Sequence, residues 1–161
     1  MPDAAVVNAS PLIFLSRAGL VDLLKQAGSR IFVPGSVLVE IKQRGANDPA
    51  AQALARNEWL TSLTLTSIPQ IIQSWDLGPG ESAVLAYAYN NPGVIAVIDD
   101  LCARRCAVTL NINVIGTLGL VLIAKRRGVI PLARPVMDNL RQTGMYLSRS
   151  TMDQALALVG E

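Results

Sequence analysis

Acidic residues stand at the ends of apolar runs, or inside them, at three places in this sequence. They are Glu40, Glu81 and the adjacent pair Asp99 and Asp100. The chain contains no histidine, so no imidazole can serve as acid, base or zinc ligand. Chemistry therefore has to run on carboxylates, hydroxyls, amines or a metal. Carboxylates that converge on one point repel each other, and a divalent cation relieves that repulsion.

Each of these residues also has a purely structural interpretation. Glu81 suits the first turn of a helix, where the macrodipole favours an anion. Asp99 or Asp100 could act as the N-cap of the helix that follows them. Glu40 could form an ion pair with a nearby basic residue on a solvated face, and Asn8 could hold a turn through its amide.

Basic residues are concentrated after the acidic ones. Residues 1–100 hold six Lys and Arg against nine Asp and Glu, whereas residues 101–149 hold eight against one. If the fold brings the two parts together, carboxylates for a metal lie beside arginines for phosphates, which is the arrangement that a nuclease needs. The alternative is that the basic residues only solvate the exposed ends of helices.

The elements that would position these side chains alternate between strand and helix. Strands are expected over residues 5–8, 31–33, 94–98 and 114–115, with a strand or extended segment over residues 59–65. Helices are expected over residues 12–17, 20–26, 50–58, 81–89, 101–108, 117–127, 131–144 and 151–159. Another helix opens at Pro34 and Ser36 and carries Glu40. Ser10 followed by Pro11 is typical of an N-cap and a first helical position.

This order predicts one α/β domain over residues 1–161, with three α/β/α layers and a mainly parallel central sheet. Residues 1–128 are expected to form the α/β core, and residues 129–161 a helical C-terminal extension. Ligands of open parallel sheets gather at the carboxyl ends of the strands. Asn8 and Asp99 follow such ends, and our hypothesis is that Glu40 and Glu81 meet them there.

Composition bounds the class of protein. Of the 161 residues, 51% are apolar and 16% charged, and the mean hydropathy of +0.38 predicts that a partner chain, such as a second copy, covers some apolar surface. The longest apolar run, residues 112–124, is too short for a spanning helix, and no export signal is recognisable at the start, so a cytoplasmic protein is expected. Cys102 and Cys106 are interpreted as buried, reduced thiols.

Four motifs occur in an order that resembles the PIN-domain superfamily over nearly the whole chain. They are the strand and helix start of residues 6–13, Val33-Pro34 followed by a helix bearing Glu40, the helix start Gly78-Pro79-Gly80-Glu81, and the strand that ends in Asp99-Asp100. A closer resemblance is to an uncharacterised bacterial and archaeal PIN-like subfamily. It rests on residues 99–105, 114–119, 124–131 and 134–138.

Proteins of this subfamily look like the toxin component of type II toxin–antitoxin pairs. The resemblance implies an RNA-cleaving fold that binds Mg²⁺ or Mn²⁺ through a few carboxylates and is held silent by an antitoxin protein. It assigns catalytic and metal-binding roles to the acidic residues, and metal binding to the residue at the end of the first strand. On this reading the metal ligands are Asn8, Glu40, Glu81, and Asp99 or Asp100.

Supporting roles follow from the same resemblance. Ser10 would hold Asn8 or a water at the cation, and Arg104 and Arg105 would contact the phosphates. The first strand of active PIN nucleases normally ends in Asp, whereas Asn8 brings no charge, which predicts weaker metal affinity. The alternatives are a PIN-like nucleic-acid-binding or regulatory module without catalysis, and a protein-interaction subunit. The few aromatic residues are scattered and predict no platform for stacking bases.

Overall fold

Five short parallel strands form the centre of the molecule. The computed structural model describes residues 2–161, with strands β1 (Ala4–Val7), β2 (Arg30–Pro34), β3 (Leu60–Leu63), β4 (Ile95–Val97) and β5 (Val114–Ile115). Their order in the sheet is β3-β2-β1-β4-β5, and every pair is parallel. All four residues of β1 are buried, which explains the unbroken apolar run, because a parallel sheet is covered on both faces.

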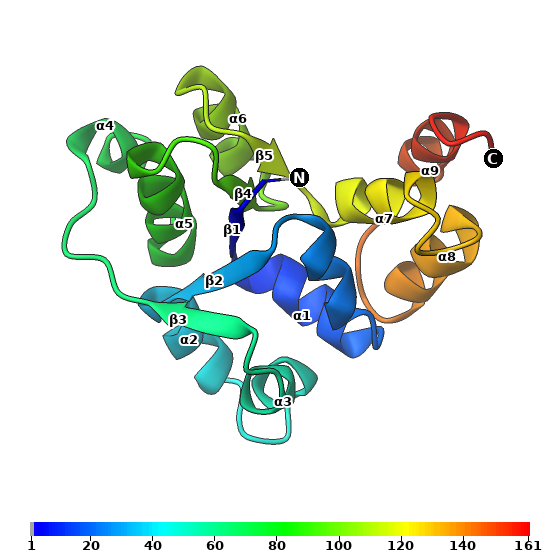
Figure 1. Ribbon diagram of the computed structural model, residues 1–161, viewed down its shortest axis with the longest axis horizontal. Coiled ribbons are helices and arrows are strands. Elements are labelled where there is room, and N and C mark those ends of the chain that lie inside the picture. Colours follow the sequence, from blue (N-terminus) through cyan, green and yellow to red (C-terminus); the bar gives the residue numbers. More distant parts are fainter. Residues whose placement is uncertain (1) are drawn as a thin grey trace.

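Helices cover both faces of this sheet. They are α1 (Ala9–Arg17), the 3-10 helix η1 (Val21–Gln26), α2 (Gly35–Lys42), α3 (Pro49–Arg56), α4 (Gln70–Gln73), α5 (Pro79–Asn90), α6 (Leu101–Thr109), α7 (Thr117–Arg126), α8 (Ala133–Gln142) and α9 (Arg149–Ala157). In Figure 1, α5 and α6 lie on one side of the strands, and α1 and α7 lie on the other. The predicted α/β class with a helix-flanked parallel sheet is confirmed, and the sheet is wholly parallel.

The order of the strands reverses next to β1. The chain runs outward from β1 to β2 and β3, then crosses back through α4 and α5 to β4 on the other side of β1. The backbone N–H of Asn8 still donates to the carbonyl of Val97, at 3.0 Å, so β1 and β4 end side by side. Such a switch point is where open α/β sheets bind ligands, and Asn8 and Asp99 follow the two strands that form it.

The C-terminal helices pack into the same core. Met137 and Leu140 of α8 and Leu156 of α9 are fully buried, and they belong to one continuous apolar cluster with β1. Helices α8 and α9 lie against α7, on the far side of α7 from β4 and β5 in Figure 1. They therefore support α7, whose first residue takes part in the candidate site.

One carboxylate closes the start of α8. Glu161 accepts hydrogen bonds from the backbone N–H groups of Ala133, at 2.7 Å, and Arg134, at 3.1 Å, and it lies 3.4 Å from the ammonium of Lys125. The bond from Ala133 in particular holds the pKa of the Glu161 carboxyl below its ordinary value. This side chain is a structural helix cap, distant in the sequence from the helix that it caps.

Three expectations differ from the structure. Helix α1 begins at Ala9 with Asn8 in the N-cap position, because Asn8 keeps extended backbone angles and its N–H stays in the sheet, so Ser10 and Pro11 lie inside the first turn. Helix α4 was not predicted. Cys106 is buried, but Cys102 is exposed on α6, which corrects the interpretation of both thiols as buried.

The buried thiol of α6, that of Cys106, has a perturbed pKa. Burial raises the pKa of the Cys106 thiol, and the neighbouring Cys102 adds to the rise.

Over the described part of the chain, residues 2–161, no helix has the length and apolar character that crossing a bilayer requires.

Candidate active site

Asn8 is a buried polar residue at the switch point, with 2% of its surface exposed. Its amide Nδ2 donates to Oε1 of Glu81 at 3.1 Å. A carboxylate can only accept, so this bond fixes the orientation of the amide. The buried Oδ1 has no hydrogen-bond partner among residues 2–161. An unpaired buried acceptor is costly, which indicates that it is kept for a ligand.

Gly80 brings Glu40 to the same place. A Cβ added at Gly80 would lie 2.8 Å from Oδ1 of Asn8, 3.4 Å from Cγ2 of Val37 and 3.5 Å from Oε2 of Glu40. The absence of a side chain therefore lets the start of α5 approach both β1 and α2 closely. We call Asn8, Glu40 and Glu81 the Asn8 cluster.

A second glycine leaves room for the Glu81 side chain. A Cβ at Gly78 would lie 2.6 Å from Oε2 of Glu81. Pro79 stands in the first turn of α5, where its missing N–H is harmless, and Glu81 follows where the helix dipole favours an anion. The spacing Gly-x-Gly-Glu thus has a steric explanation: Gly78 leaves room for the Glu81 side chain, and Gly80 leaves room for the Asn8 side chain. A hollow of about 550 Å³ opens beside Glu40 and Glu81.

Asp99 belongs to a second group of side chains. Its two carboxylate oxygens accept from the N–H and the hydroxyl of Thr117, each at 2.7 Å, and Thr117 is fully buried. Asp99 therefore lies at the start of α7, where the helix dipole stabilises its charge. A Cβ at Gly116 would lie 2.9 Å from both Oδ1 of Asp99 and Nη1 of Arg104. We call Asp99, Arg104 and Thr117 the Asp99 cluster.

Asp100 has a different role from its neighbour. Its side chain accepts from the backbone N–H of Ala103 at 2.9 Å and caps α6, and the residue is exposed. The structural interpretation offered for the pair therefore holds for Asp100. Asp99 instead faces the loop after β5, on the side of β4 away from β1.

The predicted residues meet only in part. Asn8, Glu40 and Glu81 converge on Gly80, whereas Asp99 makes its hydrogen bonds to Thr117. Within residues 2–161, no three Asp, Glu or Cys side chains lie close enough together to hold a metal ion. The Asn8 cluster contains two carboxylates, those of Glu40 and Glu81, because Asn8 supplies an amide, and Asp99 is held by Thr117.

The supporting residues are placed less centrally. Ser10 is half-buried in the first turn of α1, and no hydrogen bond joins its side chain to Asn8 in the described residues. Arg105 is exposed on α6. Their roles stay predictions.

The basic residues divide into two kinds. Lys125 bonds the carbonyl of Pro131 and pairs with Glu161, and Arg127 donates to Gln26. These side chains occupy the far end of α7, where they secure the helix. Arg104 is of the second kind, because its guanidinium lies beside the carboxylate of Asp99 in the candidate site.

Two residues of this region were not assigned a role from the sequence. Thr117 had a signal, since it starts a helix directly after a short strand. Trp75 had no such signal. It adjoins helix α6 in the structure, but in the sequence it lies 26 residues before Leu101, where that helix begins.

The fold and these side chains define an α/β protein with an oxygen-rich, partly acidic crevice at the switch point of its sheet. The model of a family described as PIN domain matches residues 4–161. The chain belongs to this PIN-domain family and has its nuclease-type fold. A search of curated proteins finds no match to the sequence.

Proposed function

We propose that this PIN-domain protein is a metal-dependent ribonuclease that hydrolyses RNA phosphodiester bonds. The observation that carries the proposal is the buried Oδ1 of Asn8, which has no partner in residues 2–161 and faces Gly80 between Glu81 and Glu40. An acceptor held in this state beside two carboxylates suits a hard cation, which takes oxygen ligands.

The donor set fits Mg²⁺ or Mn²⁺. Mg²⁺ is commonly bound through one or two carboxylates together with substrate phosphates, and the Asn8 cluster offers two carboxylates and an amide oxygen. The ion would be held by the three residues of this cluster, Asn8, Glu40 and Glu81. Asp99 is the remaining acidic residue of the proposed site. A divalent ion bound there would lower the pKa of a water and offset the charge that builds up on the phosphate.

The residues of the chain itself have separable tasks in this proposal. The Asn8 amide orients Glu81 through its hydrogen bond, and Gly78 leaves room for the second oxygen of Glu81. Thr117 holds Asp99 in place. The Arg104 guanidinium beside Asp99 can donate two parallel hydrogen bonds to a phosphate.

The test is cleavage of a labelled single-stranded RNA with Mn²⁺ or Mg²⁺, with and without EDTA. We expect metal-dependent cleavage, and a loss of at least about tenfold in Glu81→Gln, the lower range for changes around a metal. Asp100→Asn is the matched control, because Asn caps a helix as well as Asp does. Cleavage that persists in EDTA, or equal rates for wild type and Glu81→Gln, would contradict the proposal.

A second function is favoured by one observation. The Asn8–Glu81 hydrogen bond satisfies part of the Asn8 cluster without a cation, as expected for a PIN-like module that binds nucleic acid and has lost catalysis. Such a module would leave the labelled RNA uncut at all metal concentrations. It would still bind the RNA, which a binding measurement on the same samples would detect.

The partners belong to the proposal as well. Resemblance to toxins supports an antitoxin protein that silences the enzyme, and a cytoplasmic location where RNA is available. Exposed apolar side chains, such as Tyr146 at 89% and Leu158 at 65%, support a homodimer. Light scattering over a range of protein concentrations measures the oligomeric state, and a monomer at all of them would contradict the homodimer.

A further inference from the structure

Helix α6 presents a mixed basic and apolar face to solvent. Leu101, Arg104, Arg105 and Val108 follow one another at helical spacing and lie on one side of the helix. Leu101 is 62% exposed and Val108 is 68% exposed. Neither arginine side chain forms an ion pair or a hydrogen bond with the residues that the structure describes.

Trp75 completes this face from another part of the chain. The residue follows α4, in the turn where Asp76 has a φ of 54°. It lines a hollow of about 680 Å³ together with Leu101, Arg104, Arg105, Val108 and Thr109. Its indole N–H has no partner in residues 2–161, and the ring is only partly buried. We call these six residues the α6 groove.

The α6 groove is continuous with the candidate active site. Arg104 lines the groove and also places Nη1 beside Gly116, next to the carboxylate of Asp99. Two acids adjoin groove residues in the sequence: Asp76 follows Trp75, and Asp100, just before Leu101, turns its carboxylate to the N–H of Ala103. Neither lines the groove, whose charged lining residues are Arg104 and Arg105.

We propose that the α6 groove binds a single-stranded RNA segment next to the scissile phosphate, with one base stacked on Trp75 and the flanking phosphates on Arg104 and Arg105. The inference rests on the proposed function, whose substrate class it specifies. Aromatic rings stack on any unpaired base, and guanidinium groups bind phosphate oxygens, so the groove suits a single strand of unspecified sequence.

The charge and geometry favour this occupant over the others. A duplex keeps its bases paired and offers none for Trp75 to stack on. A second copy of the chain would have to bring acidic groups to two guanidinium groups that otherwise stay in water. RNA brings that charge at every nucleotide.

The experiment uses Trp75 as its own reporter. Trp59 lies just before β3, at the opposite edge of the sheet from β5. The chain has two tryptophans, so Trp59→Phe leaves Trp75 as the single one. Glu81→Gln and EDTA prevent cleavage, so that binding is measured alone. The probes are an unstructured 12-nucleotide RNA and a duplex of the same sequence, and their binding is followed by Trp75 emission and by anisotropy of labelled RNA.

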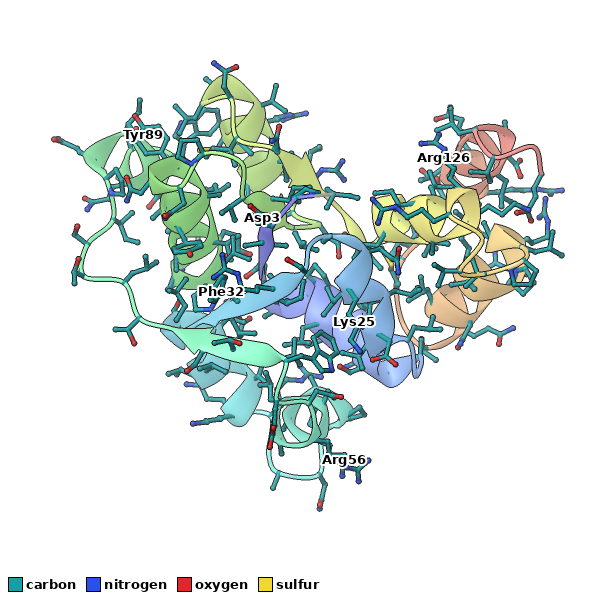
Figure 2. All side chains as sticks on the ribbon, viewed as in Figure 1. Asp3, Lys25, Phe32, Arg56, Tyr89 and Arg126 are labelled. Atoms are coloured by element: carbon teal, nitrogen blue, oxygen red, sulfur yellow. The ribbon has the colours of Figure 1, made fainter. Side chains whose placement is uncertain are left out.

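We expect the single strand to quench Trp75 and the duplex to do so much less. Trp75→Leu should weaken binding about tenfold, while Trp75→Phe keeps a stacking ring and most of the affinity. Arg105→Ala should lower the salt slope of the binding constant by roughly 0.7, the value for one phosphate contact. Arg56→Ala is the matched control, since Figure 2 shows Arg56 projecting from α3, far from α6.

Three outcomes would overturn the inference. They are binding of the single strand without any change in Trp75 emission, equal quenching by the duplex, and a shift of Trp75 emission with protein concentration in the absence of RNA, which would assign the groove to a second copy. Thermal unfolding of each variant excludes loss of fold as the cause. Absence of cleavage by the wild type would defeat the proposed function and leave these binding results standing.

Discussion

The Asn8 cluster and the Asp99 cluster lie at the ends of neighbouring strands. Both depend on a glycine, but they differ in how far their hydrogen bonds are satisfied. In each, a glycine lets a polar side chain approach backbone closely, Gly80 for Asn8 and Gly116 for Asp99. Asp99 has donors for both oxygens, whereas the buried oxygen of Asn8 has none in residues 2–161. The comparison teaches that the hydrogen bonds of one cluster are complete, whereas the other keeps an open acceptor, which we propose is filled by a cation.

Without added metal, the largest effect is expected from removing a donor in the complete cluster. Thr117→Val keeps the shape of the side chain and deletes the hydroxyl that donates to Asp99 at 2.7 Å. Hydrogen bonds to charged groups contribute about 1.5–3 kcal/mol, so urea unfolding should show a loss of about 2 kcal/mol. Thr117→Ser keeps the hydroxyl and serves as control, and equal losses for both variants would show that Asp99 does not need the donor.

Without metal, a smaller effect is expected in the incomplete cluster, and Mn²⁺ should reverse its sign. Asn8→Asp removes the donor to Glu81 and places two carboxylates together, so the protein should lose about 1 kcal/mol of stability in EDTA. With Mn²⁺ at a hundred times its Kd, the same variant should gain about 2.7 kcal/mol.

Thermal unfolding with and without Mn²⁺ measures both changes. Asn47→Asp makes the same charge change in an exposed turn and should respond to neither condition. If Asn8→Asp were no more sensitive to Mn²⁺ than wild type, the Asn8 cluster would not be a cation site.

Gly80→Ala separates the packing of the incomplete cluster from its charge. The added methyl group would meet Oδ1 of Asn8 at 2.8 Å, and the cost is partly offset by the roughly 1 kcal/mol preference of a helix for Ala over Gly. Stability should change by less than about 1 kcal/mol, whereas the stabilisation by Mn²⁺ should disappear. Gly35→Ala, whose Cβ meets only the carbonyl of Leu63 at 3.8 Å, is the matched control.

The smallest effect belongs to Glu161, a carboxylate that accepts from two backbone N–H groups at a helix start, where Asp99 accepts from one N–H and one hydroxyl. Its pKa is lowered in the folded protein, chiefly by the hydrogen bond from Ala133. Its contribution to stability is therefore present above its ordinary pKa and is lost as the pH falls through the lowered value. Glu161→Gln should lower the Tm slightly at neutral pH, and the difference from wild type should vanish in acid. A constant difference at all pH values would contradict this assignment.

The sequence predicted the fold well because its signals are local. Unbroken apolar runs marked β1 and β4, and the helix expected over residues 50–58 is α3, whose N-cap Asp48 accepts from the N–H of Ala50. The start of α1 was misplaced by two residues, since a Ser-Pro pair suggests a cap but the sheet keeps Asn8 extended.

The site was predictable only to the level of residue types. That Asp99 binds Thr117 while Asp100 caps α6 depends on a residue 18 positions later and on the backbone of the turn. The convergence of Asn8 and Glu40 on Gly80 depends on how α2 and α5 cross the sheet. No pattern of neighbouring residues contains either fact, and the placement of Trp75 beside α6 is of the same kind.

The difference between the two thiols of α6 has a practical consequence. Cys102 is exposed one turn before the buried Cys106, whose raised pKa further suppresses its thiolate. A maleimide dye at neutral pH should therefore attach to a single position of the unaltered chain. A fluorophore placed there, two residues from Asp100 and on the helix that lines the groove, would report docking of nucleic acid or of a regulatory protein without any mutation.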